Sequence, residues 1–283
     1  MKIFPGKFTA ALVSPSSLCD RQTVEEGKAF LEKHGVQVKL MPHLFSGGSL
    51  AHLSAPDELR AADINAALAD EEVDIIWAVR GGCGAMRILD KIEWELFRQR
   101  KLFFAGFSDI TAIHFAMESK GAGCRLAAPT MKFLCQGDEN VTLASLGDAI
   151  AGEGVSMELP ALNPGEVSAP LLPGNLMVAA ALCGSSYFPD TAGKIVLLEE
   201  VGEAAYRIER ALTQLKLAGA FRQCAAVVFG NFTGCGDAGE VMAVLKDFAG
   251  SVDFPVFCGF AHGHELPFIS VSGEQIFSIV PAL

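Results

Sequence analysis

Positive charge and long apolar runs are both scarce in this sequence. Its 283 residues include 22 Lys and Arg against 33 Asp and Glu, a formal net charge of −11. Surplus negative charge opposes binding to nucleic-acid backbones and to anionic lipid surfaces. No apolar run approaches the roughly 18 residues that a membrane-spanning helix needs. Residues 1–8 lack a long apolar core, so we expect no secretory signal. These absences predict a cytoplasmic protein with neither a nucleic-acid nor a membrane partner.

Metal-binding and nucleotide-binding motifs are also missing. The eight cysteines form no C-x-x-C pair and no Cys/His cluster at zinc-finger spacing. Dispersed cysteines of this kind are typical of small buried side chains in a reducing compartment. The glycine-rich residues 80–84 match neither G-x-G-x-x-G nor the P-loop. We therefore expect no metal and no cofactor.

The first half of the chain alternates β-like runs with amphipathic helical stretches. The β-like runs are residues 8–13, 36–40 and 73–79, and the helical stretches are 23–34 and 56–69. This alternation predicts an α/β domain with a parallel sheet covered by helices, of the Rossmann or flavodoxin-like kind. In such sheets ligands bind at the carboxyl ends of the strands.

Proline and glycine interrupt the pattern at residues 152–174. A segment so rich in proline and glycine predicts an interdomain linker between an N-terminal domain, 1–151, and a C-terminal domain, 175–283. Within the latter, residues 194–198 are strand-like and residues 204–218 form an amphipathic helical stretch. We expect a second, smaller α/β domain there.

One serine lies where an apolar run turns into a helix-like segment. The run that begins at Lys101 stops at Gly106, and Ser108 and Asp109 follow. A serine at such a corner is lifted out of the core, and the first N–H groups of the next helix point toward its oxygen. Ser108 is thus a candidate nucleophile. The alternative is that Ser108 or Asp109 only caps the helix that follows, since Ser and Asp are favoured caps.

A nucleophilic serine needs a base and an orienting acid, and both residue types occur at strand ends. The strand-like residues 194–198 end in Glu199 and Glu200, and a later apolar run leads to His262 and His264. Two other interpretations stay open. The glutamates are compatible with solvated carboxylates, and the histidines with a turn pair or half a metal site that lacks a third ligand.

The glycine-rich residues 80–84 follow a predicted strand. Glycines there let backbone N–H groups approach either a phosphate or a developing oxyanion. Arg80 is a candidate ligand for a substrate carboxylate, and an ion pair within the protein is the alternative.

These segments together resemble the signatures of the LD-carboxypeptidases, serine peptidases of the muramoyl-tetrapeptide carboxypeptidase and microcin-immunity type. The resemblance extends from about residue 13 to residue 273, nearly the whole chain. The segments that carry it are residues 79–90, 105–112, 174–176, 197–215 and 259–264.

The resemblance implies a role for each matching residue. The catalytic residues would be Ser108 as nucleophile, Glu199 as acid and His264 as base. The backbone N–H groups of Gly82 and Asp109 would form the oxyanion hole, and Arg80, Gly81 and Cys83 would bind substrate. The active site would form at the interface of the two domains. Cys83 stands where the family usually has an aromatic residue, and residues 265–273 depart from the family's ending, so His262 stays a second candidate base.

The implied activity is release of terminal D-Ala from murein tetrapeptides, as in peptidoglycan recycling, by a cytoplasmic homodimer acting on a small peptide. A microcin-immunity-type peptidase that cleaves peptide–nucleotide conjugates is the first alternative. With two Trp and two Tyr in the chain, we see no obvious aromatic surface for a nucleobase. A muropeptide-binding homologue without catalysis is the second alternative.

Overall fold

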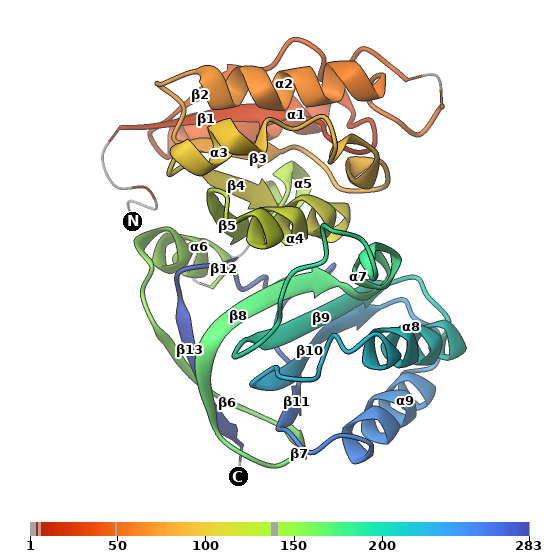
Figure 1. Ribbon diagram of the computed structural model, residues 1–283. Coiled ribbons are helices and arrows are strands. Elements are labelled where there is room, and N and C mark those ends of the chain that lie inside the picture. The colour runs from red at the N-terminus through yellow and green to blue at the C-terminus, as the bar shows by residue number, and fades with distance from the viewer. Residues whose placement is uncertain (1–3, 5–6, 49, 137–140, 283) are drawn as a thin grey trace.

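The computed structural model describes residues 4, 7–48, 50–136 and 141–282, which form two sheets stacked along the long axis of the molecule (Figure 1). The first sheet has the order β12-β5-β4-β3-β1-β2. Its strands are β1 (Phe8–Val13), β2 (Val36–Leu40), β3 (Ile75–Ala78), β4 (Phe103–Gly106), β5 (Cys124–Ala127) and β12 (Val271–Ser272). Strands β1 to β5 pair in parallel, whereas β12 pairs antiparallel to β5. The predicted parallel sheet is confirmed.

Helices cover both faces of the first sheet. They are α1 (Arg21–Lys33), α2 (Asp57–Ala69), α3 (Trp94–Gln99), α4 (Thr111–Lys120), α5 (Met131–Gln136) and α6 (Thr142–Ala151). Because side chains alternate along a strand, Ala10 and Leu12 pack with α1, α5 and α6. Ala11 and Val13 pack with α2, α3 and α4 on the other face. Burial of both faces explains why β1 is buried throughout and is apolar at every position except Thr9.

The second sheet has the order β6-β13-β8-β9-β10-β11-β7. Its strands are β6 (Val155–Leu159), β7 (Ala161–Asn163), β8 (Val167–Asn175), β9 (Ile195–Val201), β10 (Ala226–Thr233), β11 (Val256–Cys258) and β13 (Ile276–Pro281). Strands β8 to β11 pair in parallel. Helices α7 (Leu176–Leu182), α8 (Ala205–Leu217) and α9 (Ala238–Gly250) pack on one face of this sheet. The chain is therefore α/β in both halves, as predicted.

The proline-rich residues 152–174 differ from the expected linker, because they contain β6, β7 and most of β8. Strand β8 pairs with β13 through Pro170 and with β9 from Leu171 onward. Pro170 thus lies where the strand changes partners, a position at which a missing N–H is tolerated. Near the C-terminus the chain also returns to the first sheet, as β12.

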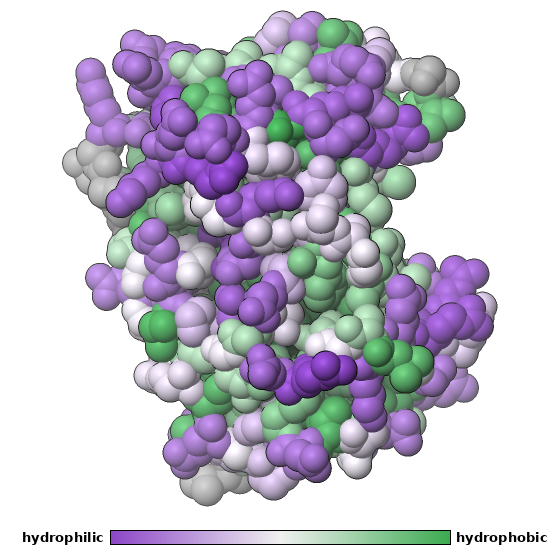
Figure 2. Space-filling view, in the orientation of Figure 1, coloured by the Kyte–Doolittle hydropathy of each residue, from purple (hydrophilic) through white to green (hydrophobic). Residues whose placement is uncertain are grey.

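The two sheets share one apolar core, which fixes their relative position. Helix α4 of the first half contacts α7 and β8 of the second. Phe115 of α4, Leu172 of β8 and Leu176 of α7 belong to the same buried cluster. Hydrophilic side chains cover α2 and α3, and the outline is indented between the two halves (Figure 2). Within the described ranges, no helix combines the length and apolar character needed to span a bilayer.

Candidate active site

The backbone turns sharply between β4 and α4, at the predicted corner. Ser108 has φ = 65°, the one positive value among the described non-glycine residues. A non-glycine residue in this region costs about 1–3 kcal/mol and persists where its surroundings hold it. Gly106 makes the turn possible, since a Cβ there would lie 2.9 Å from Cγ1 of Ile110. A short 3₁₀ turn, η2 (Ser108–Ile110), then leads into α4.

His264 joins Ser108 to Glu199. Its Nε2 lies 3.1 Å from Oγ of Ser108, and its Nδ1 lies 2.7 Å from Oε2 of Glu199. Glu199 comes from the end of β9, whose paired neighbours on both sides bury it to 1% exposure. Gly263 allows this approach, because a Cβ there would lie 3.1 Å from Oε2 of Glu199. The structure thus brings the three predicted residues into one hydrogen-bonded chain.

The second glutamate and an asparagine complete the surroundings of Glu199. Nδ2 of Asn175 donates to Oε1 of Glu199 at 3.2 Å and to Oε1 of Glu200 at 3.0 Å. Glu200 also accepts from the backbone N–H groups of Met177 and Val201. Burial raises the pKa of Glu200 above its ordinary value. Neither glutamate is the solvated carboxylate that the sequence left open.

His262 is turned away from the serine. It is buried, and its Nδ1 donates to the carbonyl of Ile269 at 2.9 Å. Burial lowers its pKa, which keeps the imidazole neutral. Of the two candidate bases, His264 is the one that is hydrogen-bonded to Ser108.

The glycine-rich turn lies directly against the serine. A Cβ on Gly81 would lie 3.0 Å from Cβ of Ser108, and one on Gly82 would lie 2.3 Å from Oγ of Ser17. Gly82 has φ = 110°. The N–H of Cys83 donates to Oγ of Ser17 at 3.1 Å. Only glycines allow backbone groups to approach Ser108 this closely.

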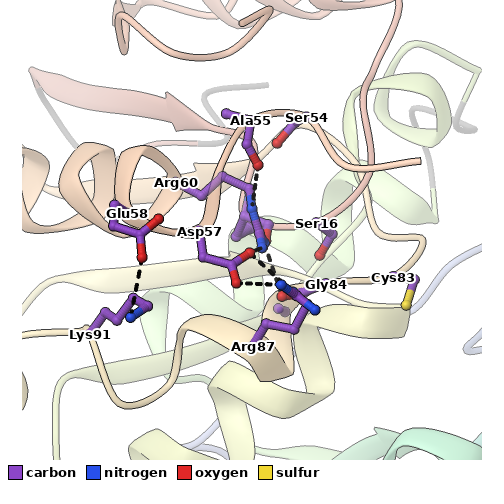
Figure 3. Close-up of polar contacts among 12 residues, drawn as sticks. Ser16, Ser54, Ala55, Asp57, Glu58, Arg60, Cys83, Gly84, Arg87 and Lys91 are labelled. Atoms are coloured by element: carbon purple, nitrogen blue, oxygen red, sulfur yellow. Dashed lines mark hydrogen bonds and ion pairs between the residues drawn. The ribbon is translucent and has the colours of Figure 1, made fainter. Parts of the chain in front are cut away.

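A buried arginine supports this turn from behind (Figure 3). Arg60 of α2 is 2% exposed and donates from Nη1 to the carbonyls of Gly84, at 2.9 Å, and of Pro15. It also pairs with Asp57, which Arg87 contacts from the solvent side. The pKa of Asp57 is lowered, mainly by its hydrogen bonds with Arg87. The loops after β1 and β3 are thus tied to one guanidinium.

Asp109 ties the same loops to the nucleophile. Its Oδ2 accepts from Oγ of Ser16 at 2.6 Å and from the N–H of Ala85 at 2.8 Å. Burial raises the pKa of this carboxyl. Because Asp109 follows Ser108 directly, its side chain fixes the spacing between the serine and the glycine-rich turn.

Ser108 opens into a cleft of about 470 Å³. The residues around it come from both halves of the molecule: Cys19, Asp20, Thr23, Val79, Arg80, Gly81, Gly82, Phe107, Ser108, Thr130, Lys132, Phe133, Val201 and His264. Cys83 belongs to the glycine-rich turn and is exposed, but it is not one of the described residues that line this cleft. Arg80 is exposed and donates to the carbonyl of Leu18, and it forms no ion pair with another of the residues that the structure describes. The sequence pattern gave no signal for Lys132 and Phe133, because α5 carries no distinctive motif.

This chain is similar in sequence and in fold to several known proteins. Residues 10–126 match the LD-carboxypeptidase N-terminal domain and residues 168–275 match the LD-carboxypeptidase C-terminal domain. A putative carboxypeptidase of Rickettsia conorii is 30% identical over 90% of this chain and 82% of its own length. The murein tetrapeptide carboxypeptidase of Pseudomonas aeruginosa is 29% identical over 90% of this chain and 87% of its own length. The microcin C7 self-immunity protein MccF has a similar fold, with a TM-score of 0.83, 19% identity and coverage of 94% of this chain and 90% of MccF.

Proposed function

Since this chain belongs to the LD-carboxypeptidase family, we propose that it is a serine carboxypeptidase that releases the terminal D-Ala from murein tetrapeptides. The observation that carries the proposal is the hydrogen-bonded chain from Ser108 through His264 to Glu199 beside an open cleft. The murein tetrapeptide carboxypeptidase among its relatives supports the substrate class and a place in peptidoglycan recycling.

In the proposed mechanism, His264 accepts the proton of Ser108 as the serine oxygen attacks the carbonyl before D-Ala. Glu199 holds the proton on Nδ1 and stabilises the imidazolium that forms. The N–H groups of Gly82 and Asp109 stabilise the oxyanion. His264 then protonates the departing amine, and a water that the same imidazole activates hydrolyses the acyl-enzyme.

A carboxypeptidase also binds the free carboxylate of its substrate. Arg80 and Lys132 line the cleft together with Ser108 and are its cationic side chains. Their positive charges can pair with the carboxylate at an anionic peptide end. We therefore assign carboxylate recognition to this pair.

The direct test is incubation with the tetrapeptide L-Ala-D-Glu-meso-diaminopimelate-D-Ala, followed by measurement of released D-Ala. The natural protein should release D-Ala, and Ser108→Ala should lower kcat by at least about 10³-fold because the nucleophile is lost. Equal rates for the two proteins would exclude Ser108 as nucleophile. Absence of release by the natural protein would exclude this substrate.

A second candidate activity is cleavage of peptide–nucleotide conjugates, as the shared fold with MccF suggests. The observation that favours it is Phe133, a half-buried aromatic side chain at the cleft whose ring packs edge-on against Phe107 at 5.5 Å. Such a ring offers a stacking surface for a base. A panel of aminoacyl-nucleotide conjugates distinguishes the two activities. Tight muropeptide binding without cleavage of either substrate would instead favour a binding protein.

A further inference from the structure

Thr111 links the nucleophile side of the site to the acid side. It opens α4, shortly after Ser108, and its Oγ1 accepts a 2.8 Å hydrogen bond from the backbone N–H of Asn175. Asn175 ends β8 in the second sheet. Both residues are buried, so bulk solvent does not compete for this bond. It is a direct polar contact between the two halves of the molecule next to Ser108.

Asn175 has little freedom to turn away from this contact. Its Oδ1 accepts from the N–H of Val178 and caps α7. Its Nδ2 donates to both Glu199 and Glu200. An amide whose oxygen and both hydrogens are used cannot flip without losing several buried hydrogen bonds. A displacement of the Asn175 backbone is therefore passed on to Glu199.

Close packing at Gly174 maintains the short distance between the two segments. A Cβ at this glycine would lie 2.9 Å from Cγ2 of Thr111 and 3.0 Å from the ring of Phe115. Strand β8 thus lies against α4 with no space for a side chain. Ser108, Thr111, Asn175 and Glu199 also line a small cavity of about 10 Å³, the size of one water molecule.

We propose that Thr111 is a positioning residue for the reaction. Its hydroxyl closes a ring that runs from Ser108 through His264, Glu199 and Asn175 back to Thr111. Because the nucleophile and the acid belong to different sheets, this ring sets the distance between them. A displacement of about 1 Å at a reacting centre lowers rates by about 10²-fold. This inference rests on the proposed role of Ser108.

The test uses three variants and a probe that does not depend on the substrate. Thr111→Val keeps the shape of the side chain but removes the acceptor, whereas Thr111→Ser keeps the acceptor. Thr142→Val is the matched control, because Oγ1 of this buried threonine accepts the N–H of Phe268 at 3.1 Å outside the ring. A fluorophosphonate is the probe, since Ser108 Oγ forms a bond to phosphorus as fluoride leaves and His264 takes the proton.

We expect Thr111→Val to be labelled about 10- to 100-fold more slowly than the natural protein, with kcat for D-Ala release lowered similarly. KM should stay within about threefold, because Thr111 does not line the cleft. Thr111→Ser should label within about threefold of the natural rate, a rescue that requires the hydroxyl. Thr142→Val should lower the melting temperature without slowing the labelling. Thr111→Ala replaces Thr111→Val if the latter does not fold.

Three other outcomes would contradict the positioning role of Thr111 or the proposed function. Equal labelling of the natural protein and Thr111→Val would overturn the positioning role and leave the proposed function intact. Slow labelling of Thr111→Ser as well would overturn it too, because packing rather than the hydroxyl would then matter. No labelling of the natural protein at Ser108, as located by mass spectrometry, would overturn the proposed function and this inference together.

Discussion

The two sides of the candidate active site use different kinds of structure. On the nucleophile side, Ser108 begins η2, and the backbone of the glycine-rich turn lies against it. Positive φ angles at Gly82 and Ser108 shape these segments. Buried side chains that never reach the cleft, chiefly Arg60 and Asp109, support them by bonding to backbone atoms.

On the acid–base side, the groups that face Ser108 are side chains. His264 is held by Glu199, and Glu199 is held by Asn175, with Glu200 behind them. These residues come from segments far apart in the chain and meet through side-chain hydrogen bonds. On the nucleophile side, the residues that support the backbone are thus different from the groups that would do the chemistry, whereas on the acid–base side the same side chains do both. Substitutions of the supporting residues on the first side should act on stability, and substitutions on the second mainly on activity.

The largest expected effect is a loss of activity on the acid–base side. Glu199→Gln removes the charge that stabilises the His264 cation and that fixes its tautomer, so we expect kcat to fall by about 10³- to 10⁴-fold. The free energy of unfolding should fall by about 1–3 kcal/mol, because the new amide NH2 faces either Nδ2 of Asn175 or Nδ1 of His264, and both of these atoms are donors. Steady-state kinetics and urea denaturation measure the two quantities. A loss of several kcal/mol in the free energy of unfolding with a normal kcat would mean that Glu199 supports the fold and not the reaction.

The second largest expected effect is a loss of stability on the nucleophile side, where Arg60 supports the backbone. Arg60→Met leaves Asp57 and the carbonyls of Pro15 and Gly84 without their buried donor. We expect the free energy of unfolding to fall by about 3–5 kcal/mol. The matched control is Arg87→Met, which removes the exposed partner of the same Asp57 and should cost no more than about 1 kcal/mol. Equal losses in the two variants would mean that the buried arginine has no special role.

The smallest effect concerns a property that both sides share. His114 on α4 and His262 are buried, and burial lowers the pKa of each, that of His114 to about 3. The unfolded chain binds a proton near pH 6.5 that folded His114 does not bind until about pH 3, so stability falls as pH falls through 6.5.

From pH 7.5 to pH 5, His114 should thus cost about 2 kcal/mol of the free energy of unfolding. His114→Gln preserves a donor for the carbonyl of Phe104, which Nε2 of His114 now contacts. This variant should lose less stability over the same pH range in urea denaturation. A pH dependence identical to that of the natural protein would show that His114 is not the source.

Much of the first sheet follows from local pattern. The apolar runs 8–13 and 36–40 coincide with β1 and β2, and residues 73–79 contain β3. The corner at Ser108 also follows from local pattern, because an apolar run reaches Gly106 and the polar residues Ser108 and Asp109 come shortly after it. Periodicity and turn residues depend on neighbours in the chain, so they can be recognised without knowledge of the tertiary structure.

The strands of residues 152–174 and the short β12 were not predicted. Proline and glycine concealed β6 to β8, whose stability comes from pairing with distant β13, β11 and β9. Strand β12 spans only two residues and is held by β5. The interdomain position of the site, the linker and the domain boundaries came from composition and resemblance, which do not report strand pairing.

Within the site, the sequence by itself determined which chemical groups are available and where the chain turns. It supplied Ser108 at a corner, glycines beside it, and Glu199 and His264 near later strand ends. Only the tertiary structure decided that His264 rather than His262 meets Ser108, and that Thr111, Asn175 and Arg60 tie the parts together. A hydrogen bond forms only when the donor and acceptor distance is right to within a few tenths of an ångström. The pattern of residues along the chain predicts burial and turns, but it does not predict such distances between residues that are far apart in the sequence.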